Sequence, residues 1–189
     1  MNRTCRRRQQ LLAALALTPF AGLGWAHTPY RQWVVYRRKH LLIGTTRADP
    51  DGYRLGKALA ATLADELPES QARVARARNA RRLASLLATG QLQVALLGIG
   101  EAQAMAAGEP PFEDTGPTEL RVLLVLGERV LVAVADLPDH HAWLVTGTLV
   151  EVGYGIGAPR IRPQLPLHQG SLTYLEGAEM PDAQGELGH

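Results

Sequence analysis

Cysteine is almost absent from this chain of 189 residues, and its one cysteine, Cys5, lies close to the N-terminus. The first 26 residues have the pattern of a cleavable export signal, described below, which removes Cys5 from the mature protein. The chain from His27 onward therefore has no thiol nucleophile, no disulfide and no thiolate metal site. An oxidising compartment permits this composition without requiring it.

Long hydrophobic runs are absent as well. The apolar stretch over residues 11–17 is followed at once by Thr18 and Pro19. A helix that crosses a bilayer needs about 20 apolar residues. We therefore expect no stable membrane insertion.

Motifs for catalysis and metal binding are also scarce. The adjacent pair His140 and His141 diverges by about 100 degrees on a helix, and no Glu or His follows at four-residue spacing. Ser85 and Ser171 lack the G-x-S-x-G turn of a nucleophilic serine. Residues 98–100 (GIG) lack the third glycine of a dinucleotide fingerprint. The sequence thus predicts no enzyme, no metal site and no cofactor.

The N-terminus carries what is typical of an export signal. Four arginines precede an uncharged stretch over residues 9–26, and residues 24–26 (GWA) offer small side chains at both positions that determine cleavage. We predict that residues 1–26 are removed and that the protein is periplasmic. The pair Arg7 and Arg8 leaves two export routes open, the general secretory route and the twin-arginine route, which carries folded proteins.

Removal of the signal changes the net charge. Taking its four arginines from the 20 basic residues leaves 16 beside all 18 acidic ones, a formal net charge of −2. The mature protein therefore lacks the basic excess of a nucleic-acid-binding domain.

The remaining 163 or so residues suffice for one domain. We predict a lead-in over residues 27–39, a single domain over 40–180 and a flexible tail over 181–189. Strands are predicted at 41–44, 72–77, 92–97, 120–126 and 129–134, and helices at 53–67, 79–90, 98–108, 138–150 and 171–176. This alternation predicts an α/β domain with a mostly parallel sheet flanked by helices.

Two polar clusters are candidate sites. Thr45 and Thr46 follow the first strand, where open α/β sheets bind ligands, and the helix that begins near Gly52 is expected to offer free backbone donors to an anion. An ordinary polar loop is the alternative. The second cluster consists of Arg78, Arg81 and Arg82. Their spacing of three and four residues favours one helix face that grips a carboxylate or an acidic protein surface, and a solvated face is the alternative.

Several segments, in their order along the chain, carry a family resemblance. They are residues 43–46 (IGTT), 83–96 (LASLLATGQLQVAL), 108–112 (GEPPF), 135–139 (ADLPD) and 165–174 (LPLHQGSLTY). Together they resemble the TAXI group of solute-binding proteins, the periplasmic receptors of TRAP transporters. The last segment looks like the Pro-Leu-His-Pro-Gly-Ala signature of that group, followed by a tyrosine. The resemblance implies that His168 and Tyr174 pack the domain rather than bind a ligand.

The chain departs from that group in two ways. The receptors have two lobes with the ligand between them, whereas this chain is long enough for one periplasmic-binding-protein-like lobe only. The polar turns that face the ligand in the group fall here on residues 77–80 (ARNA) and 98–100 (GIG). A buried carboxylate needs hydrogen-bond donors on both sides of a cleft, and one lobe supplies one side.

Two non-catalytic functions follow from the resemblance. In the first, the protein binds a small organic anion, such as a dicarboxylate or an amino acid, for transport through TRAP membrane subunits, with Thr45, Thr46, Arg78 and Asn79 as ligand contacts. In the alternative, the single lobe is an accessory subunit. It then docks onto an exported enzyme or receptor through Arg78, Arg81 and Arg82.

Overall fold

The computed structural model describes residues 40–155 and 163–182. The predicted signal, the lead-in and most of the predicted tail lie outside the described residues. The strands are β1 (Leu42–Thr46), β2 (Arg73–Ala77), β3 (Val94–Gly98), β4 (Leu120–Leu126) and β5 (Arg129–Val134). The helices are α2 (Pro50–Glu66), the 3-10 helix η1 (Pro68–Ser70), α3 (Ala80–Ala88), α4 (Ile99–Ala107), α5 (Asp139–Glu151) and α6 (Gln169–Leu175).

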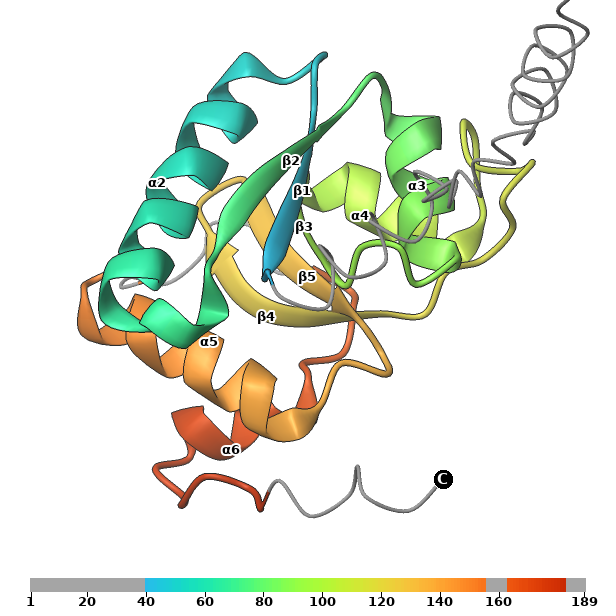
Figure 1. The fold of residues 1–189 in the computed structure, drawn as a ribbon. Coiled ribbons are helices and arrows are strands. Elements are labelled where there is room, and N and C mark those ends of the chain that lie inside the picture. The colour runs from blue at the N-terminus through green and yellow to red at the C-terminus, as the bar shows by residue number, and fades with distance from the viewer. Residues whose placement is uncertain (1–39, 156–162, 183–189) are drawn as a thin grey trace, which may run out of the picture.

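The strands form one mixed sheet in the order β2-β1-β3-β5-β4 (Figure 1). An α/β domain is thus confirmed, but the sheet is mixed rather than mostly parallel. Strand β1 pairs in parallel with β2 and β3, whereas β5 runs antiparallel to both β3 and β4. The reason is the connection from β4 to β5, which consists of Gly127 and Glu128 alone. Two residues can join antiparallel strands only, and Gly127 adopts the positive φ of 69° that such a tight turn uses.

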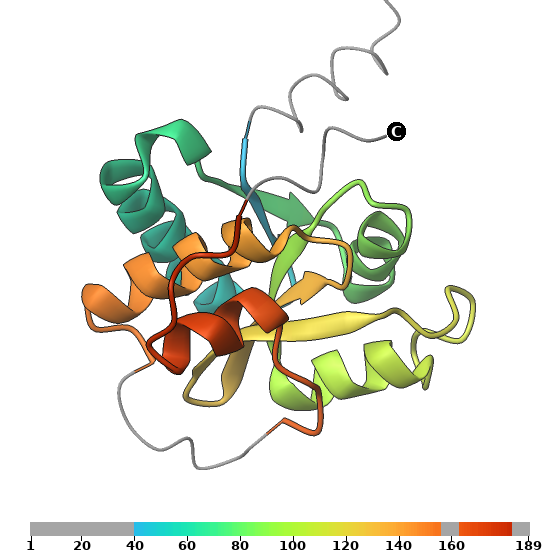
Figure 2. The ribbon, with the colours of Figure 1, turned by 90° about the horizontal axis from the view of Figure 1, so that it is seen from below.

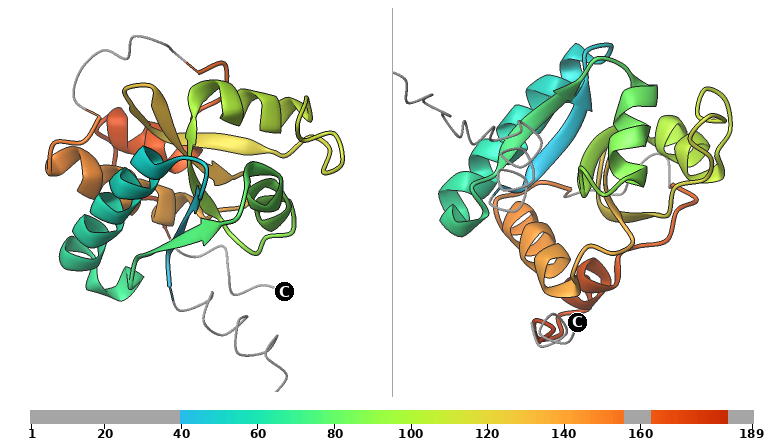
Figure 3. Two further views of the ribbon diagram at one scale, coloured as in Figure 1. Left: turned by 90° about the horizontal axis from the view of Figure 1, so that it is seen from above. Right: turned by 45° about the vertical axis from the view of Figure 1, so that its right-hand side comes forward.

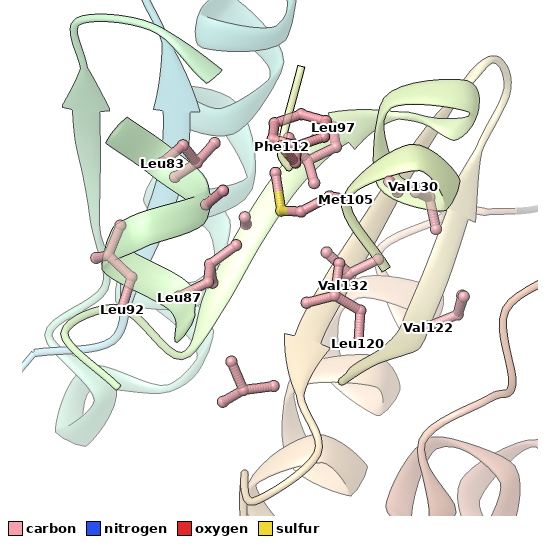
Figure 4. Close-up of a cluster of buried hydrophobic side chains, with 14 of the residues drawn as sticks. Leu83, Leu87, Leu92, Leu97, Met105, Phe112, Leu120, Val122, Val130 and Val132 are labelled. Carbon is pink, nitrogen blue, oxygen red and sulfur yellow. The ribbon is translucent and has the colours of Figure 1, made fainter. Parts of the chain in front are cut away.

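Helices cover both faces of the sheet. Helices α2 and α5 pack on one face and α3 and α4 on the other, and Figure 3 shows α2 and α3 on opposite sides of β1 and β2. The apolar run of β3 is buried on both faces because successive side chains alternate. Val94 and Leu96 belong to the α2 side, whereas Ala95 and Leu97 belong to the α3 side. Figure 4 shows the α3 side of this core, where Phe112 lies beside Leu97.

The helix ends follow local chemistry. As predicted, Asn79 caps α3, because its Oδ1 accepts a hydrogen bond from the Arg82 backbone N–H at 2.9 Å. Gly108 ends α4 with a φ of 69°. The expected start of α2 at Tyr53 was three residues late, because Pro50 occupies the first turn and Asp49 caps it.

The C-terminal segment packs α6 against α5 (Figure 2). Tyr174 lies on α5 at Gly147, where an added Cβ would stand only 2.7 Å from the tyrosine ring, and its ring meets Trp143 edge to face at 5.2 Å. His168 is 2% exposed, and its Nε2 lies 2.9 Å from the Leu137 carbonyl oxygen. Both residues are therefore packing residues, in agreement with the prediction.

The same segment pairs with the outer edge of β4 at Val122. The Val122 N–H donates to the Pro166 carbonyl at 2.9 Å, and the Val122 carbonyl accepts from the His168 N–H at 2.8 Å. This bridge is parallel. In the part of the chain that the structure describes, no helix is long and apolar enough to cross a bilayer.

Candidate functional site

The predicted site residues meet at one edge of the sheet, where the parallel strands β1, β2 and β3 end. Thr46, the last residue of β1, is the register partner of Ala77, the last residue of β2. Arg78 and Asn79 follow directly. Because β5 is antiparallel, its first residue, Arg129, comes to this edge opposite Gly98. The N-termini of α2, α3 and α4 lie here too, which is the edge where open α/β sheets bind ligands.

An ion pair between Asp49 and Arg129 joins the loop after β1 to the start of β5. Arg129 donates from Nε to Oδ2 at 3.0 Å and from Nη2 to Oδ1 at 2.7 Å, so the contact is bidentate. This hydrogen-bonded pair lowers the pKa of Asp49 and raises that of Arg129. The side chains are 32% and 28% exposed, so the pair is shielded from water more than a surface pair.

Asp49 also caps α2. Its Oδ1 accepts from the Gly52 N–H at 2.9 Å, and a Cβ on Gly52 would stand 2.2 Å from Oδ2. Gly52 thus allows the carboxylate to come close. The expectation of a free donor at Gly52 is wrong, because the protein's own carboxylate occupies it.

Glu101 occupies the N-terminus of α4 in a similar way. It stands three residues after the N-cap residue Gly98, and its half-buried carboxyl accepts a hydrogen bond from the Gly98 N–H. Burial raises the pKa of Glu101, and the charge of Asp49 raises it further, whereas the hydrogen bond lowers it. A second carboxylate therefore lies near Asp49, and because Arg129 is already paired with Asp49, this half of the edge has no excess of positive charge.

The other half of the edge, around the end of β2, is basic. Arg47 and Arg78 are exposed, and the Arg47 N–H donates to the Ala77 carbonyl at 3.0 Å, which holds the two loops side by side. Arg76 lies over the ring of Tyr53 at 4.4 Å from its centroid. Within residues 40–155 and 163–182, Arg78 forms no ion pair.

The four predicted ligand contacts are brought together but differ in access. Thr45 is 1% exposed and its hydroxyl donates to the Ala75 carbonyl at 3.4 Å, and Thr46 is 5% exposed. Arg78 and Asn79 are exposed. A molecule that approaches this edge therefore meets the exposed Arg78 and Asn79, whereas the buried side chains of Thr45 and Thr46 are hardly accessible to it.

The predicted docking residues are all exposed, but they do not share one helix face. Arg81 and Arg82 lie in the first turn of α3, whereas Arg78 precedes its N-cap residue Asn79. Arg81 has a long contact of 3.7 Å to Asp114, with side chains 62% and 86% exposed, so it adds little stability. Arg78 and Arg82 have no ion-pair partner in the described part of the chain.

Two grooves lie elsewhere on the described surface. One, of about 250 Å³, separates the end of α2 from α5 and includes Leu67 and Trp143. The other, of about 380 Å³, runs between α2 and β2. Neither opens at the edge where the predicted ligand residues meet.

Sequence reasoning missed Asp49, Glu101 and Arg129. The pattern Asp49-Pro50 is a helix-start signal, and a Glu three residues after Gly98 is half of a capping box. The roles of Asp49 and Glu101 at helix N-termini could therefore have been predicted from the sequence. No local pattern links Arg129 to a residue 80 positions away.

The described residues include no group of three or more His, Cys, Asp or Glu side chains placed to hold a metal ion. No model of a known protein family matches the chain, and no curated protein matches it.

Proposed function

We propose that this chain is an exported, non-catalytic solute-binding protein of the TAXI type, reduced to one lobe. It binds a small organic anion, such as a dicarboxylate or an amino acid, and passes it to the membrane subunits of a TRAP transporter in the periplasm. One observation carries this proposal. Arg78 is exposed at the carboxyl edge of the strands and forms no ion pair within the described residues.

Each of the four predicted residues has its own role in binding the anion. The guanidinium of Arg78 matches a carboxylate in a bidentate geometry. The Oδ1 of Asn79 already accepts from the Arg82 N–H, so its amide nitrogen is left to donate to the same carboxylate. Thr45 and Thr46 are buried, and the hydrogen bond from the Thr45 hydroxyl to the Ala75 carbonyl helps to hold β1 beside β2.

Thermal denaturation in the presence of glutamate, 2-oxoglutarate, succinate and malate tests this proposal. A ligand at 100 times its dissociation constant stabilises the folded state by about 2.7 kcal/mol. For a domain of this size that corresponds to a rise in Tm of about 5 to 10 °C, and the rise saturates with concentration.

Arg78→Ala identifies the site. Hydrogen bonds to a charged group contribute about 1.5 to 3 kcal/mol, so the substitution weakens binding roughly 10- to 150-fold. The matched control is Arg73→Ala, which removes an exposed arginine from the other end of β2. If both variants lose the same anion affinity, the binding is general charge attraction and not a site at Arg78. If none of the four anions raises Tm, the receptor function is rejected.

A second function is favoured by the openness of the same edge. Arg78 and Arg82 are exposed and unpaired within the described residues, and neither groove reported above lies at this edge. The lobe then acts as an accessory subunit that docks onto an acidic surface of an exported enzyme or receptor. The expected result is co-purification with one exported protein, lost in the Arg78→Ala, Arg82→Ala double variant and kept in Arg54→Ala. Unchanged association of the double variant refutes docking by this face.

A further inference from the structure

Strand β2 forms an open edge of the sheet. The Arg73 N–H donates to the Leu41 carbonyl at 2.9 Å, and the Ala77 carbonyl accepts from Arg47 at 3.0 Å, so these residues bond toward β1. Since backbone groups alternate in direction along a strand, Val74 and Arg76 point their N–H and C=O groups outward. These four groups form no hydrogen bond with any residue that the structure describes.

A groove accompanies this edge. It lies between α2 and the beginning of β2, has a volume of about 380 Å³ and is lined by Lys57, Ala60, Ala61, Ala64, Ala72, Arg73 and Val74. Side chains of an added strand alternate between the two faces of the sheet. Those on the α2 face would enter the groove, where alanines leave room for a side chain the size of valine.

The charge of this edge is of one sign. Lys57 and Arg73 are the charged residues that line the groove, and Arg76 follows along β2. Neither the strand nor the lining of the groove contributes an acidic side chain. Arginines would oppose each other if two copies paired through β2, which disfavours a second copy of this chain as the occupant.

We propose that the free edge of β2 binds an extended acidic segment of a partner protein, which adds to the sheet as a sixth strand. The backbone of Val74 and Arg76 provides the hydrogen bonds, the groove accepts small apolar side chains from alternate positions, and the basic residues select acidic ones. This is recognition by strand addition. It uses a different part of the surface from the anion site and does not depend on that function.

The probe is a capped ten-residue peptide of alternating glutamate and valine. We expect saturable binding to the purified protein by isothermal titration calorimetry. In nitrogen-15 NMR, the Val74 and Arg76 amides are expected to exchange at least tenfold more slowly with the peptide bound. A peptide with lysine in place of glutamate is expected not to bind, and Arg73→Glu is expected to weaken binding of the acidic peptide at least tenfold.

A peptide of the same sequence, N-methylated at every residue, separates strand addition from charge attraction without altering the protein. Its side chains are unchanged, but it offers no N–H groups to the edge. We expect at least tenfold weaker binding. Equal affinity of the methylated and unmodified peptides refutes strand addition, as does a lack of binding. A third result also refutes it: sedimentation shows a dimer, the Val74 and Arg76 amides exchange slowly without peptide, and the peptide does not bind. A second copy of the chain is then the occupant of the edge.

Discussion

Replacement of Asp49 by alanine separates the structural role of this residue from a general effect of charge. The substitution removes two hydrogen bonds from Arg129, at 2.7 and 3.0 Å, and the cap on the Gly52 N–H at 2.9 Å. Loss of an N-cap costs about 1 kcal/mol, and the loss of a partly shielded, charged hydrogen-bond pair costs about 1.5 to 3 kcal/mol. We therefore expect Asp49→Ala to lower the free energy of unfolding by about 2 to 4 kcal/mol.

Asp51→Ala is the matched control. This neighbouring carboxylate pairs with Arg54 on the surface, where both side chains are more than 60% exposed, so its loss is expected to cost less than about 1 kcal/mol. Urea denaturation followed by circular dichroism gives the free energies of unfolding, and a double-mutant cycle with Arg129→Ala gives the coupling between Asp49 and Arg129.

The pH dependence follows from the lowered pKa of Asp49. A carboxylate whose folded pKa lies below its ordinary value of 3.8 stabilises the fold above that value, and the contribution is lost as the pH falls through the folded pKa. The native protein and Asp49→Ala should therefore converge in stability in acid. Equal costs for Asp49→Ala and Asp51→Ala at neutral pH, or a coupling of zero to Arg129, would falsify this account.

Three further predictions concern the packing of the domain. Burial lowers the pKa of His168 below its usual 6.5, so the unfolded chain binds a proton more readily than the folded one. The free energy of unfolding therefore falls as the pH drops below about 6.5. His168→Asn should reduce this dependence on pH in denaturation measured between pH 5 and 8. Gly147→Ala should destabilise by about 1 kcal/mol in urea denaturation, because the clash with Tyr174 exceeds the gain in helix propensity; in a Tyr174→Ala background the same change should stabilise. Phe112→Ala should cost about 3 to 5 kcal/mol, since the ring is 1% exposed, and a cost below 1 kcal/mol in the same assay would contradict the packing in Figure 4.

The sequence was most informative about elements whose pattern is local. The apolar run that became β3 and the pair Asn79 and Gly90 around α3 predicted the element and its ends, because strand burial and helix caps depend on neighbouring residues. The direction of β5 was not predicted, although the sequence contains the short connection that determines it. A connection of two residues after Leu126 dictates an antiparallel pair, and this local constraint overrides the parallel tendency of alternating strands and helices.

The candidate site was predictable in place more than in chemistry. Thr46 and Arg78 were expected directly after strands. The structure instead makes Thr46 the last residue of β1, with Arg78 directly after β2, and strand ends in such sheets meet at one edge. Their access to solvent depends on the helices packed around them, which no local pattern reports. The Asp49 and Arg129 pair depends on β5 lying next to β3, and that arrangement joins residues 80 positions apart.

The two outer strands of the sheet differ in a way that limits how the domain can assemble. At β4, the Val122 backbone is already bonded to Pro166 and His168, and the register shift between Val122 and Leu124 bends the strand. At β2, the outward backbone groups have no partner within the described residues. An outer strand that is already bonded near its middle and carries a register shift there is a poor template for another strand. Growth of a fibre, which needs both ends of the sheet, is therefore disfavoured, and strand addition is expected at β2 alone.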